Sequence, residues 1–186
     1  RQRYARILKD NKLKQVLNYE KVREGDVFFI PAGRVHALGP DIMVAEIQQT
    51  SDVTYRIYAW GRIDVAGMKR ELHIPQSLDA VDFSIPDTFK MPYKNLLNAT
   101  TPVIDTPFFV TNMLQLDGTI AKDYSDLDSF VILLCAKGNF SLEWDFGSVF
   151  VDVGECVLIP NVINKVKIKT DNYCKLLEVY IRENEY

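Results

Sequence analysis

From residue 22 onward, short apolar runs alternate with polar positions and are separated by glycine, proline and aspartate. This period of two is typical of β-strands that bury one face. Many short strands at such spacing favour a sandwich or a barrel. The alternation of Lys with apolar residues over 165–169 indicates a strand whose lysines face solvent. The other predicted strands span residues 27–30, 42–48, 53–58, 108–116, 130–136, 140–144, 156–159 and 174–181.

Two segments depart from this pattern. Residues 4–20 carry apolar side chains at helical spacing among Lys, Arg and Asn, which predicts one or two short amphipathic helices. Residues 84–107 contain four prolines, and proline has no N–H to donate to a strand ladder. We therefore expect an irregular linker there, which divides the chain near residue 100.

An internal repeat relates the two parts. Residues 22–31 align with residues 151–160 at a constant offset of 129 (160 − 31), and both copies read Gly, an acidic residue, four apolar residues and Pro. This pattern predicts a tight turn at glycine, a buried strand and a proline that ends it. Beyond the proline the copies diverge, and the offset places Lys165 where the first copy has His36. A neutral imidazole can bind a metal ion, whereas an ammonium group has no lone pair.

Composition excludes several classes of protein. With 47% hydrophobic and 25% charged residues, the 186-residue chain is typical of a globular protein with a core. Its 22 basic and 25 acidic residues give a net charge of −3, which disfavours nucleic acid as a partner. The longest apolar run, residues 130–136, is far shorter than the ~20 residues of a membrane span. Three widely spaced cysteines predict neither a disulfide framework nor a cysteine zinc site, so we expect a cytoplasmic protein.

Motifs in the first copy resemble those of a known family. The pattern Gly25-x5-Pro31-x-Gly33-x2-His36 is similar to the second motif of the cupin superfamily. The segments 31–39 and 46–58, extended by Arg70-Glu71-Leu72-His73, resemble the type I mannose-6-phosphate isomerases. The resemblance implies a mainly β fold of two cupin-type (jelly-roll) antiparallel β-barrels, the first incomplete, with a short N-terminal helical segment. It covers most of the chain and is strongest over residues 22–78.

The resemblance also implies a domain layout. Residues 1–21 would be the end of a helical insertion, and residues 22–83 part of the first cupin barrel with the active site. Residues 84–107 would be the linker, and residues 108–186 a second, metal-free cupin-like barrel.

The resemblance implies a function as well: a divalent metal, usually zinc, assists the interconversion of mannose 6-phosphate and fructose 6-phosphate through an enediol. It makes His36 one metal ligand and Arg56 the active-site arginine. Glu46 and Asp52 match acidic positions around the same pocket, and which of them is the better candidate base stays open. Arg62 falls where some members carry a basic residue for the phosphate. The expected partner is a phosphorylated hexose.

The residues themselves agree with this assignment. Alternate side chains of a strand point the same way, so Asp52 and Arg56 would share one polar face. Polar groups that converge in a barrel mouth favour a binding site, although a surface ion pair is the alternative. A permanently cationic arginine can stabilise a developing enediolate.

The match is incomplete. A catalytic zinc site usually takes three protein ligands, and the chain contains only two histidines, His36 and His73. The resemblance places the other ligands upstream, so we expect this chain to be the C-terminal portion of a longer protein and inactive alone. His73 alternates with apolar neighbours, which favours a structural role. Ala59 stands where many members have Asp, so a non-catalytic sugar-binding or structural cupin is the alternative. An iron dioxygenase would need further ligands near His36, and the sequence offers none.

Overall fold

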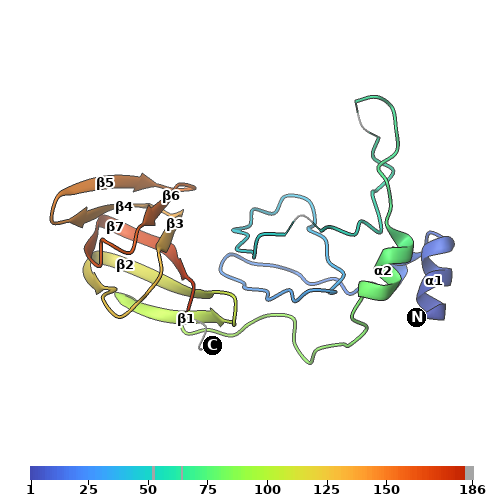
Figure 1. The fold of residues 1–186 in the computed structure, drawn as a ribbon, viewed down its shortest axis with the longest axis horizontal. Helices are drawn as coiled ribbons and strands as arrows, with labels where there is room; N and C mark the ends of the chain where they lie inside the picture. The colour runs from blue at the N-terminus through green and yellow to red at the C-terminus, as the bar shows by residue number, and fades with distance from the viewer. Residues whose placement is uncertain (52, 64, 183–186) are drawn as a thin grey trace. The chain divides into compact units, whose positions relative to one another are not determined.

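The structure is a computed structural model that describes residues 1–51, 53–63 and 65–182. Along the chain, its helices come before its strands (Figure 1). The chain forms two compact units. Unit 1 comprises residues 1–44 and 50–90, and unit 2 comprises residues 45–49 and those from Met91 onward. No helix in the described part of the chain combines the length and apolar character needed to cross a bilayer.

Unit 2 contains an antiparallel sheet of seven strands. Along the main path the strand order is β1-β2-β7-β3-β6, while β4 pairs with β5 and β7. The strands are β1 (Ala99–Asp105), β2 (Val110–Asp123), β3 (Val131–Lys137), β4 (Asn139–Trp144), β5 (Gly147–Asp152), β6 (Cys156–Ile159) and β7 (Lys165–Tyr180).

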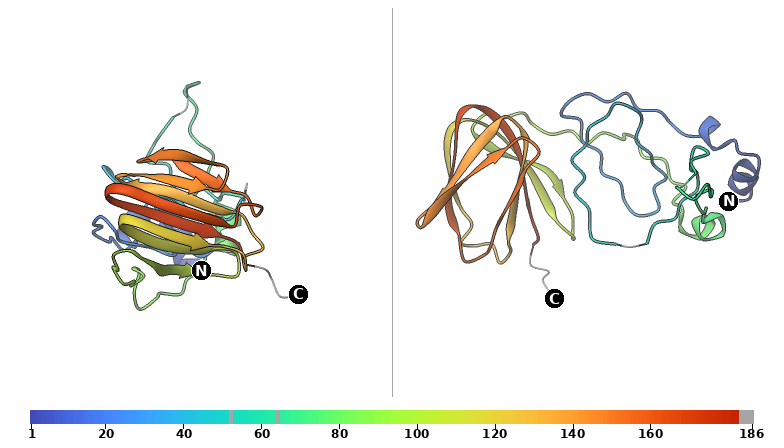
Figure 2. Two further views of the ribbon diagram at one scale, coloured as in Figure 1. Left: turned by 90° about the vertical axis from the view of Figure 1, so that its left-hand side faces the viewer. Right: turned by 90° about the horizontal axis from the view of Figure 1, so that it is seen from above.

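The two longest strands, β2 and β7, make the sheet fold back on itself. They pair along most of their length, with a register shift between Leu116 and Gly118. The first part of β7 also pairs with β4 and its last part with β3, so two groups of strands face each other across an interior (Figure 2). The sheet is not closed, because β1 and β6 end its path.

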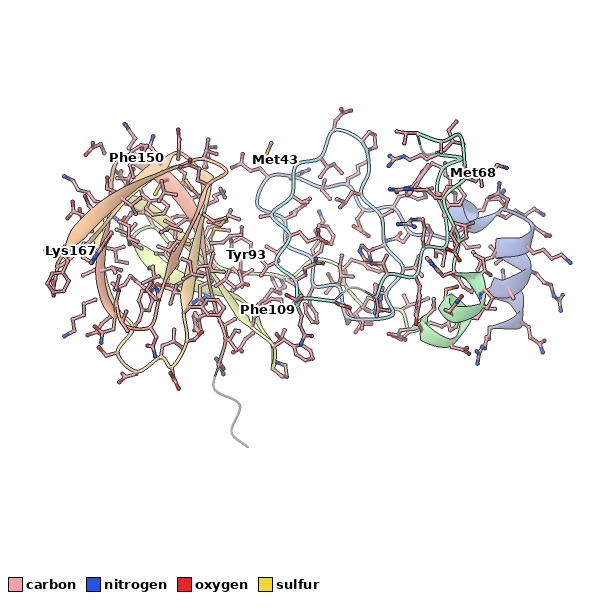
Figure 3. All side chains as sticks on the ribbon, turned by 45° about the horizontal axis from the view of Figure 1, so that its top comes forward. Met43, Met68, Tyr93, Phe109, Phe150 and Lys167 are labelled. Carbon is pink, nitrogen blue, oxygen red and sulfur yellow. The ribbon has the colours of Figure 1, made fainter. Side chains whose placement is uncertain are left out.

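Alternate side chains along these strands fill the interior. In β7, Val166 and Ile168 are buried while Lys165, Lys167 and Lys169 are exposed, which confirms the predicted strand with one solvated face. Lys167 lies on the outside of the sheet in Figure 3. All three cysteines are free thiols. The largest fully buried apolar side chains include Phe140, Leu114, Leu116, Leu133, Ile168 and Leu176.

Most strands predicted in the second half are present. The predicted strand 156–159 coincides with β6, and the predictions over 108–116, 130–136 and 140–144 overlap β2, β3 and β4. The expected irregular segment 84–107 differs, because β1 lies within it and contains Pro102. Proline is tolerated there because β1 is an edge strand and its pairing with β2 shifts register between Pro102 and Ile104.

Unit 1 contains the helices. The α-helix α1 (Gln2–Lys9) and the short 3-10 helix η1 (Leu13–Gln15) confirm the predicted N-terminal helical segment. A further helix, α2 (Ile74–Ala80), was not expected from the apolar pattern. It begins with Pro75 in its first turn, a position that suits proline because the first N–H groups of a helix have no partner within it.

The strands predicted over 27–30, 42–48 and 53–58 are absent, so these three predictions were wrong. Its described residues contain an isolated bridge between Ile63 and Lys69 but no strand, so the two-barrel organisation is not seen as a second sheet. A strand needs a neighbour to accept and donate its backbone hydrogen bonds. Several apolar side chains of these segments are exposed, among them Phe29, Ile30, Val44 and Val53.

The repeat nevertheless has the same turn in both copies. Gly25 and Gly154 have positive φ values of 90° and 85°, as the predicted tight turn at glycine requires. In each copy the acidic residue's N–H donates to the carbonyl three residues earlier, and its carboxylate accepts from the N–H of that same residue. The distances are 3.0 and 2.9 Å for Asp26 with Arg23, and 3.0 and 2.9 Å for Glu155 with Asp152.

The second copy of this turn is anchored to a strand. Gly154 donates to Cys135 at 2.8 Å, and Cys135 donates to Glu155 at 3.0 Å, which ties the turn to β3. The offset of 129 matches Cys135 to Arg6, which lies in helix α1 and not in a strand.

Candidate functional site

His36 lies on an exposed loop of unit 1 that follows Pro31. Its Nδ1 lies 3.0 Å from the carbonyl oxygen of Arg34. Because a carbonyl only accepts hydrogen bonds, Nδ1 carries the hydrogen and donates in this contact. In the neutral ring the lone pair is then on Nε2, the arrangement in which metal-binding histidines are commonly held. His36 therefore fits the role of a single metal ligand.

The rest of a metal site is not found within the described ranges. No group of three or more His, Cys, Asp or Glu side chains there could hold a metal ion. His36 is the candidate ligand among the described residues, and the metal remains a proposal.

The loop that carries His36 rests on the C-terminal end of α2. Gly33 has φ +84°, and a Cβ there would lie 2.6 Å from the carbonyl oxygen of Ala80. The N–H of Asp82 donates to the oxygen of Gly33 at 3.0 Å, and the Asp82 carboxylate lies 3.6 Å from the guanidinium of Arg34. Hydrogen bonds from Ser84, and then the charge of Arg34, lower the pKa of the Asp82 carboxyl.

Arg56 is half-buried, and its backbone is tied to the other end of α2. The N–H of Arg56 donates to Nδ1 of His73 at 3.0 Å, and the N–H of His73 donates to the carbonyl of Arg56 at 2.7 Å. His73 is the N-cap residue of α2, and its carbonyl accepts from the N–H of Ser77 at 2.9 Å. The hydroxyl of the buried Ser77 donates to Ile74 at 2.8 Å.

Helix α2 therefore links the segments that carry His36 and Arg56. Seven residues at 1.5 Å per residue make it about 10 Å long. Among the described residues, no hydrogen bond or ion pair joins His36 directly to Arg56. That the two side chains face one cavity remains a prediction.

The structure describes one of the two candidate bases. Glu46 is exposed and belongs to residues 45–49 of unit 2, whereas His36 and Arg56 belong to unit 1. Asp52 lies outside the described residues. The roles assigned to both carboxylates remain predictions.

Arg62 is at the end of a tight turn. Its N–H donates to the carbonyl of Ala59 at 2.8 Å, and Trp60 and Gly61 between them have φ values of 51° and 68°. Two successive positive φ values are those of a type I′ turn. The exposed guanidinium lies 5.9 Å from the centroid of the Trp60 ring, a cation–π arrangement.

A second cation joins this group. The Tyr58 and Trp60 rings meet edge to face with centroids 5.2 Å apart, and Nζ of Lys14 lies 5.4 Å from the Tyr58 centroid. Lys14 and Arg62 thus each contact one ring of the same aromatic pair. Sequence reasoning missed Lys14, because nothing in the chain pattern connects the N-terminal segment with residues 58–62.

The protein is mainly β, and its antiparallel sheet is consistent with the predicted cupin fold. The candidate residues His36, Arg56 and Arg62 lie in unit 1. No family model matches the chain. It is 32% identical to the mannose-6-phosphate isomerase of Streptococcus mutans over 151 residues, which is 81% of this chain and 47% of that protein. It is 36% identical to a mannose-6-phosphate isomerase of Bacillus subtilis over 107 residues, 56% of this chain and 34% of that protein.

Solved structures agree on the fold. The crystal structure of the mannose 6-phosphate isomerase from Bacillus subtilis aligns with a TM-score of 0.59 and 21% identity, over 70% of this chain and 41% of that one. The chain is therefore homologous to curated proteins named mannose-6-phosphate isomerase, as its motifs predicted. It spans about half the length, or less, of the curated relatives that it matches.

Proposed function

We propose that the protein containing this chain is a metal-dependent aldose–ketose isomerase that interconverts mannose 6-phosphate and fructose 6-phosphate through an enediol. Homology to proteins named mannose-6-phosphate isomerase over four fifths of the chain supports this proposal. The structural observation that carries it is the link through α2, which joins the backbone of Arg56 to the loop of His36.

In this proposal each candidate residue has one task. Arg56 stabilises the negative charge that develops on the enediolate and stays protonated throughout. Glu46 or Asp52 moves the proton between C1 and C2. Arg62 contacts the phosphate of the hexose, and Lys14 adds a second positive charge to the same group of side chains.

The proposed metal is zinc, with Nε2 of His36 as one ligand. When bound, such a cation would polarise the substrate carbonyl or order the sugar hydroxyls. The hydrogen bond from Nδ1 to Arg34 supports this role because it sets the ring tautomer and orientation.

The remaining ligands belong, in this proposal, to a part of the protein upstream of this chain. The span of about half the length of its relatives supports that view, as do the exposed apolar side chains of unit 1. The same proposal makes residues 22–83 an incomplete first cupin barrel and residues 108–186 a metal-free second barrel, joined by a linker over 84–107. The end of a helical insertion would occupy residues 1–21, and the protein would be cytoplasmic.

Isomerase activity of the full-length protein tests the proposal. We expect conversion of mannose 6-phosphate to fructose 6-phosphate, loss of activity with a chelator and recovery with zinc. Arg56→Ala should lower kcat by about 100-fold or more, the usual effect of removing a group that stabilises a developing anion. Arg6→Ala, which changes an exposed arginine on α1, is the matched control and should keep normal activity. Full activity of Arg56→Ala would refute the role assigned to Arg56.

The alternative function is a non-catalytic sugar-binding or structural cupin. The incomplete donor set among the described residues and Ala59 favour it. Isothermal titration of the zinc-supplemented full-length protein with mannose 6-phosphate distinguishes the two. Binding without turnover would support the alternative and contradict the isomerase.

A further inference from the structure

We propose that His73 is a positioning residue for Arg56, and that it acts by holding the Arg56 backbone against helix α2. The inference rests on the proposed function, which makes Arg56 the arginine of the active site. It changes the interpretation of His73, whose apolar neighbours in the sequence indicated no more than a structural role.

The contact between the two residues is reciprocal. The N–H of Arg56 donates to Nδ1 of His73 at 3.0 Å, and the N–H of His73 donates to the carbonyl of Arg56 at 2.7 Å. Both polar groups of the Arg56 backbone are therefore bound by one residue. Together the two hydrogen bonds fix the peptide planes on either side of the Arg56 Cα, and thereby the point from which the guanidinium side chain extends.

The contact also determines the state of the imidazole. Because Nδ1 accepts a hydrogen bond, it carries no hydrogen, and the ring is neutral with its hydrogen on Nε2. This is the opposite tautomer from His36, whose Nδ1 donates to a carbonyl. His73 is half-buried and the Tyr55 ring lies 6.2 Å from it, centroid to centroid. The two histidines of the chain are thus held in different tautomers. Nδ1 of His73 accepts a hydrogen bond from a backbone N–H, whereas His36 keeps the lone pair of its Nε2 available.

The position of His73 extends its effect beyond residue 56. As the N-cap residue it starts α2, and its carbonyl accepts from the buried Ser77 in the first turns of the helix. At the other end of α2, Ala80 and Asp82 touch Gly33 in the loop of His36. His73 therefore fixes the backbone of Arg56 relative to the segment that carries the candidate metal ligand. A shift of about 1 Å in such a group can lower the rate by as much as ~100-fold.

To keep the hydrogen bond from the Arg56 N–H, the side chain at position 73 must place an acceptor atom where Nδ1 of His73 lies. Asn can present its Oδ1 at that place and preserve the hydrogen bond from Arg56. Phe fills a similar volume with no acceptor and leaves the Arg56 N–H without a partner there. The pair His73→Asn and His73→Phe therefore separates hydrogen bonding from packing. Gln76→Ala changes an exposed side chain on α2 and is the matched control.

The first experiment measures kcat and KM for mannose 6-phosphate in the full-length protein. We expect His73→Phe to lower kcat about tenfold or more with a smaller change in KM, and His73→Asn to restore most of kcat. Gln76→Ala should match the parent. Normal kcat in His73→Phe, or equal losses in the Phe and Asn variants, would overturn the proposal.

A double-mutant cycle covers the case in which His73→Phe disturbs folding. If His73 acts through Arg56, the substitution His73→Asn or His73→Phe should cost little further activity in a protein that already carries Arg56→Ala. A general structural role would lower the residual activity of Arg56→Ala by the same factor as in the parent, and that result would overturn the proposal.

Amide hydrogen exchange separates failure of this inference from failure of the proposed function. In the full-length protein, the Arg56 amide should exchange faster in His73→Phe than in the parent and stay protected in His73→Asn. This result would support the contact even if the parent showed no isomerase activity, in which case the proposed function would be wrong. Equal exchange at Arg56 in all three proteins would contradict the role of His73.

Discussion

At the scale of single residues, the carboxylate of Glu178 is the most deeply buried charge described in unit 2, with 2% of its surface exposed. One carboxylate oxygen accepts from the hydroxyl of Tyr124 at 2.7 Å and faces the ammonium of Lys122 at 2.7 Å. The other accepts from the amide of Asn112 at 2.8 Å. Burial and the adjacent Glu178 raise the pKa of Tyr124 far above its usual range, so its hydroxyl stays a donor.

Removal of this carboxylate should destabilise unit 2 strongly. Glu178→Ala leaves Lys122, Tyr124 and Asn112 without their shared partner, and we expect a loss of about 3–5 kcal/mol in the free energy of unfolding. Glu143→Ala, at an exposed position on β4, should change it by less than ~0.5 kcal/mol. Urea denaturation followed by circular dichroism measures both. A loss for Glu178→Ala as small as that of the control would show that the cluster contributes little.

A second residue-scale prediction concerns Asp26 in the first repeat turn. The ammonium of Lys90, 2.6 Å away, and then the N–H of Arg23 lower the pKa of its carboxyl. A pKa that is lower in the folded state gives stability that is present above the unfolded value of ~3.9 and is lost as the pH falls through the folded value.

Asp26→Asn should therefore make the protein less sensitive to acid in that range. We expect the stability difference between the parent and Asp26→Asn to be present at neutral pH and to shrink below about pH 4. Lys90→Met should reduce the same acid dependence, because it removes the first cause of the lowered pKa. Thermal unfolding between neutral pH and pH 3 is the measurement. An identical pH dependence in all three proteins would contradict this account of Asp26.

At the scale of elements, α2 connects the candidate residues, and its contact with Gly33 can be tested separately. A Cβ at Gly33 would meet backbone atoms of Ala80 and Asp82 at 2.6 and 3.0 Å, so Gly33→Ala must shift the loop of His36 away from α2. Gly67 has a similar φ of +77°, but a Cβ there would meet nothing within 4 Å.

Gly67→Ala should therefore cost only the left-handed backbone penalty of about 1–2 kcal/mol, whereas Gly33→Ala should cost more. Gly33→Ala should also lower isomerase activity of the full-length protein, because it moves the segment that carries His36. Thermal unfolding and the isomerase assay measure the two effects. Equal destabilisation by the two substitutions would mean that the packing of Gly33 on α2 is unimportant.

Among the elements, the strands with both a clear alternation and a partner in this chain were the predictable ones. The segment 156–159 was predicted with its observed bounds because glycine and proline mark its two ends. Helix α2 was missed because seven residues are too few to show a helical period, although Pro75 is a start signal. β1 was missed because Pro102 argues against a strand unless the strand is known to lie at an edge, and the sequence does not reveal that order.

At the scale of the whole molecule, the repeat predicted the same turn and the same buried strand in both copies. The turn is present in both, whereas the strand is present at 156–159 and absent at 27–30. The turn depends on local hydrogen bonds at Gly25 and Gly154, which the sequence specifies directly. A sheet depends on neighbours distant in the chain, and unit 1 lacks strand neighbours among its described residues. For the same reason the candidate residues could be chosen from motifs, whereas the contact between Arg56 and His73 could not.

Hydrogen exchange can test whether unit 1 is completed by other parts of the protein. In the 186-residue chain alone, amides of residues 27–30 and 42–48 should exchange much faster than those of β2, β3 and β7, because they form no strand ladder. In the full-length protein we expect these segments to become protected. Fast exchange in both proteins would contradict the proposal that residues 22–83 are part of a first cupin barrel.

The pairing of β7 has a consequence for synthesis on the ribosome. This strand follows every strand that it joins, and it hydrogen-bonds to β2, β3 and β4. The earlier strands therefore leave the exit tunnel without their shared neighbour and stay exposed to chaperones until residues 165–180 emerge. We therefore expect a nascent polypeptide that stalls before Lys165 to leave β2 and β3 without the strand that joins them.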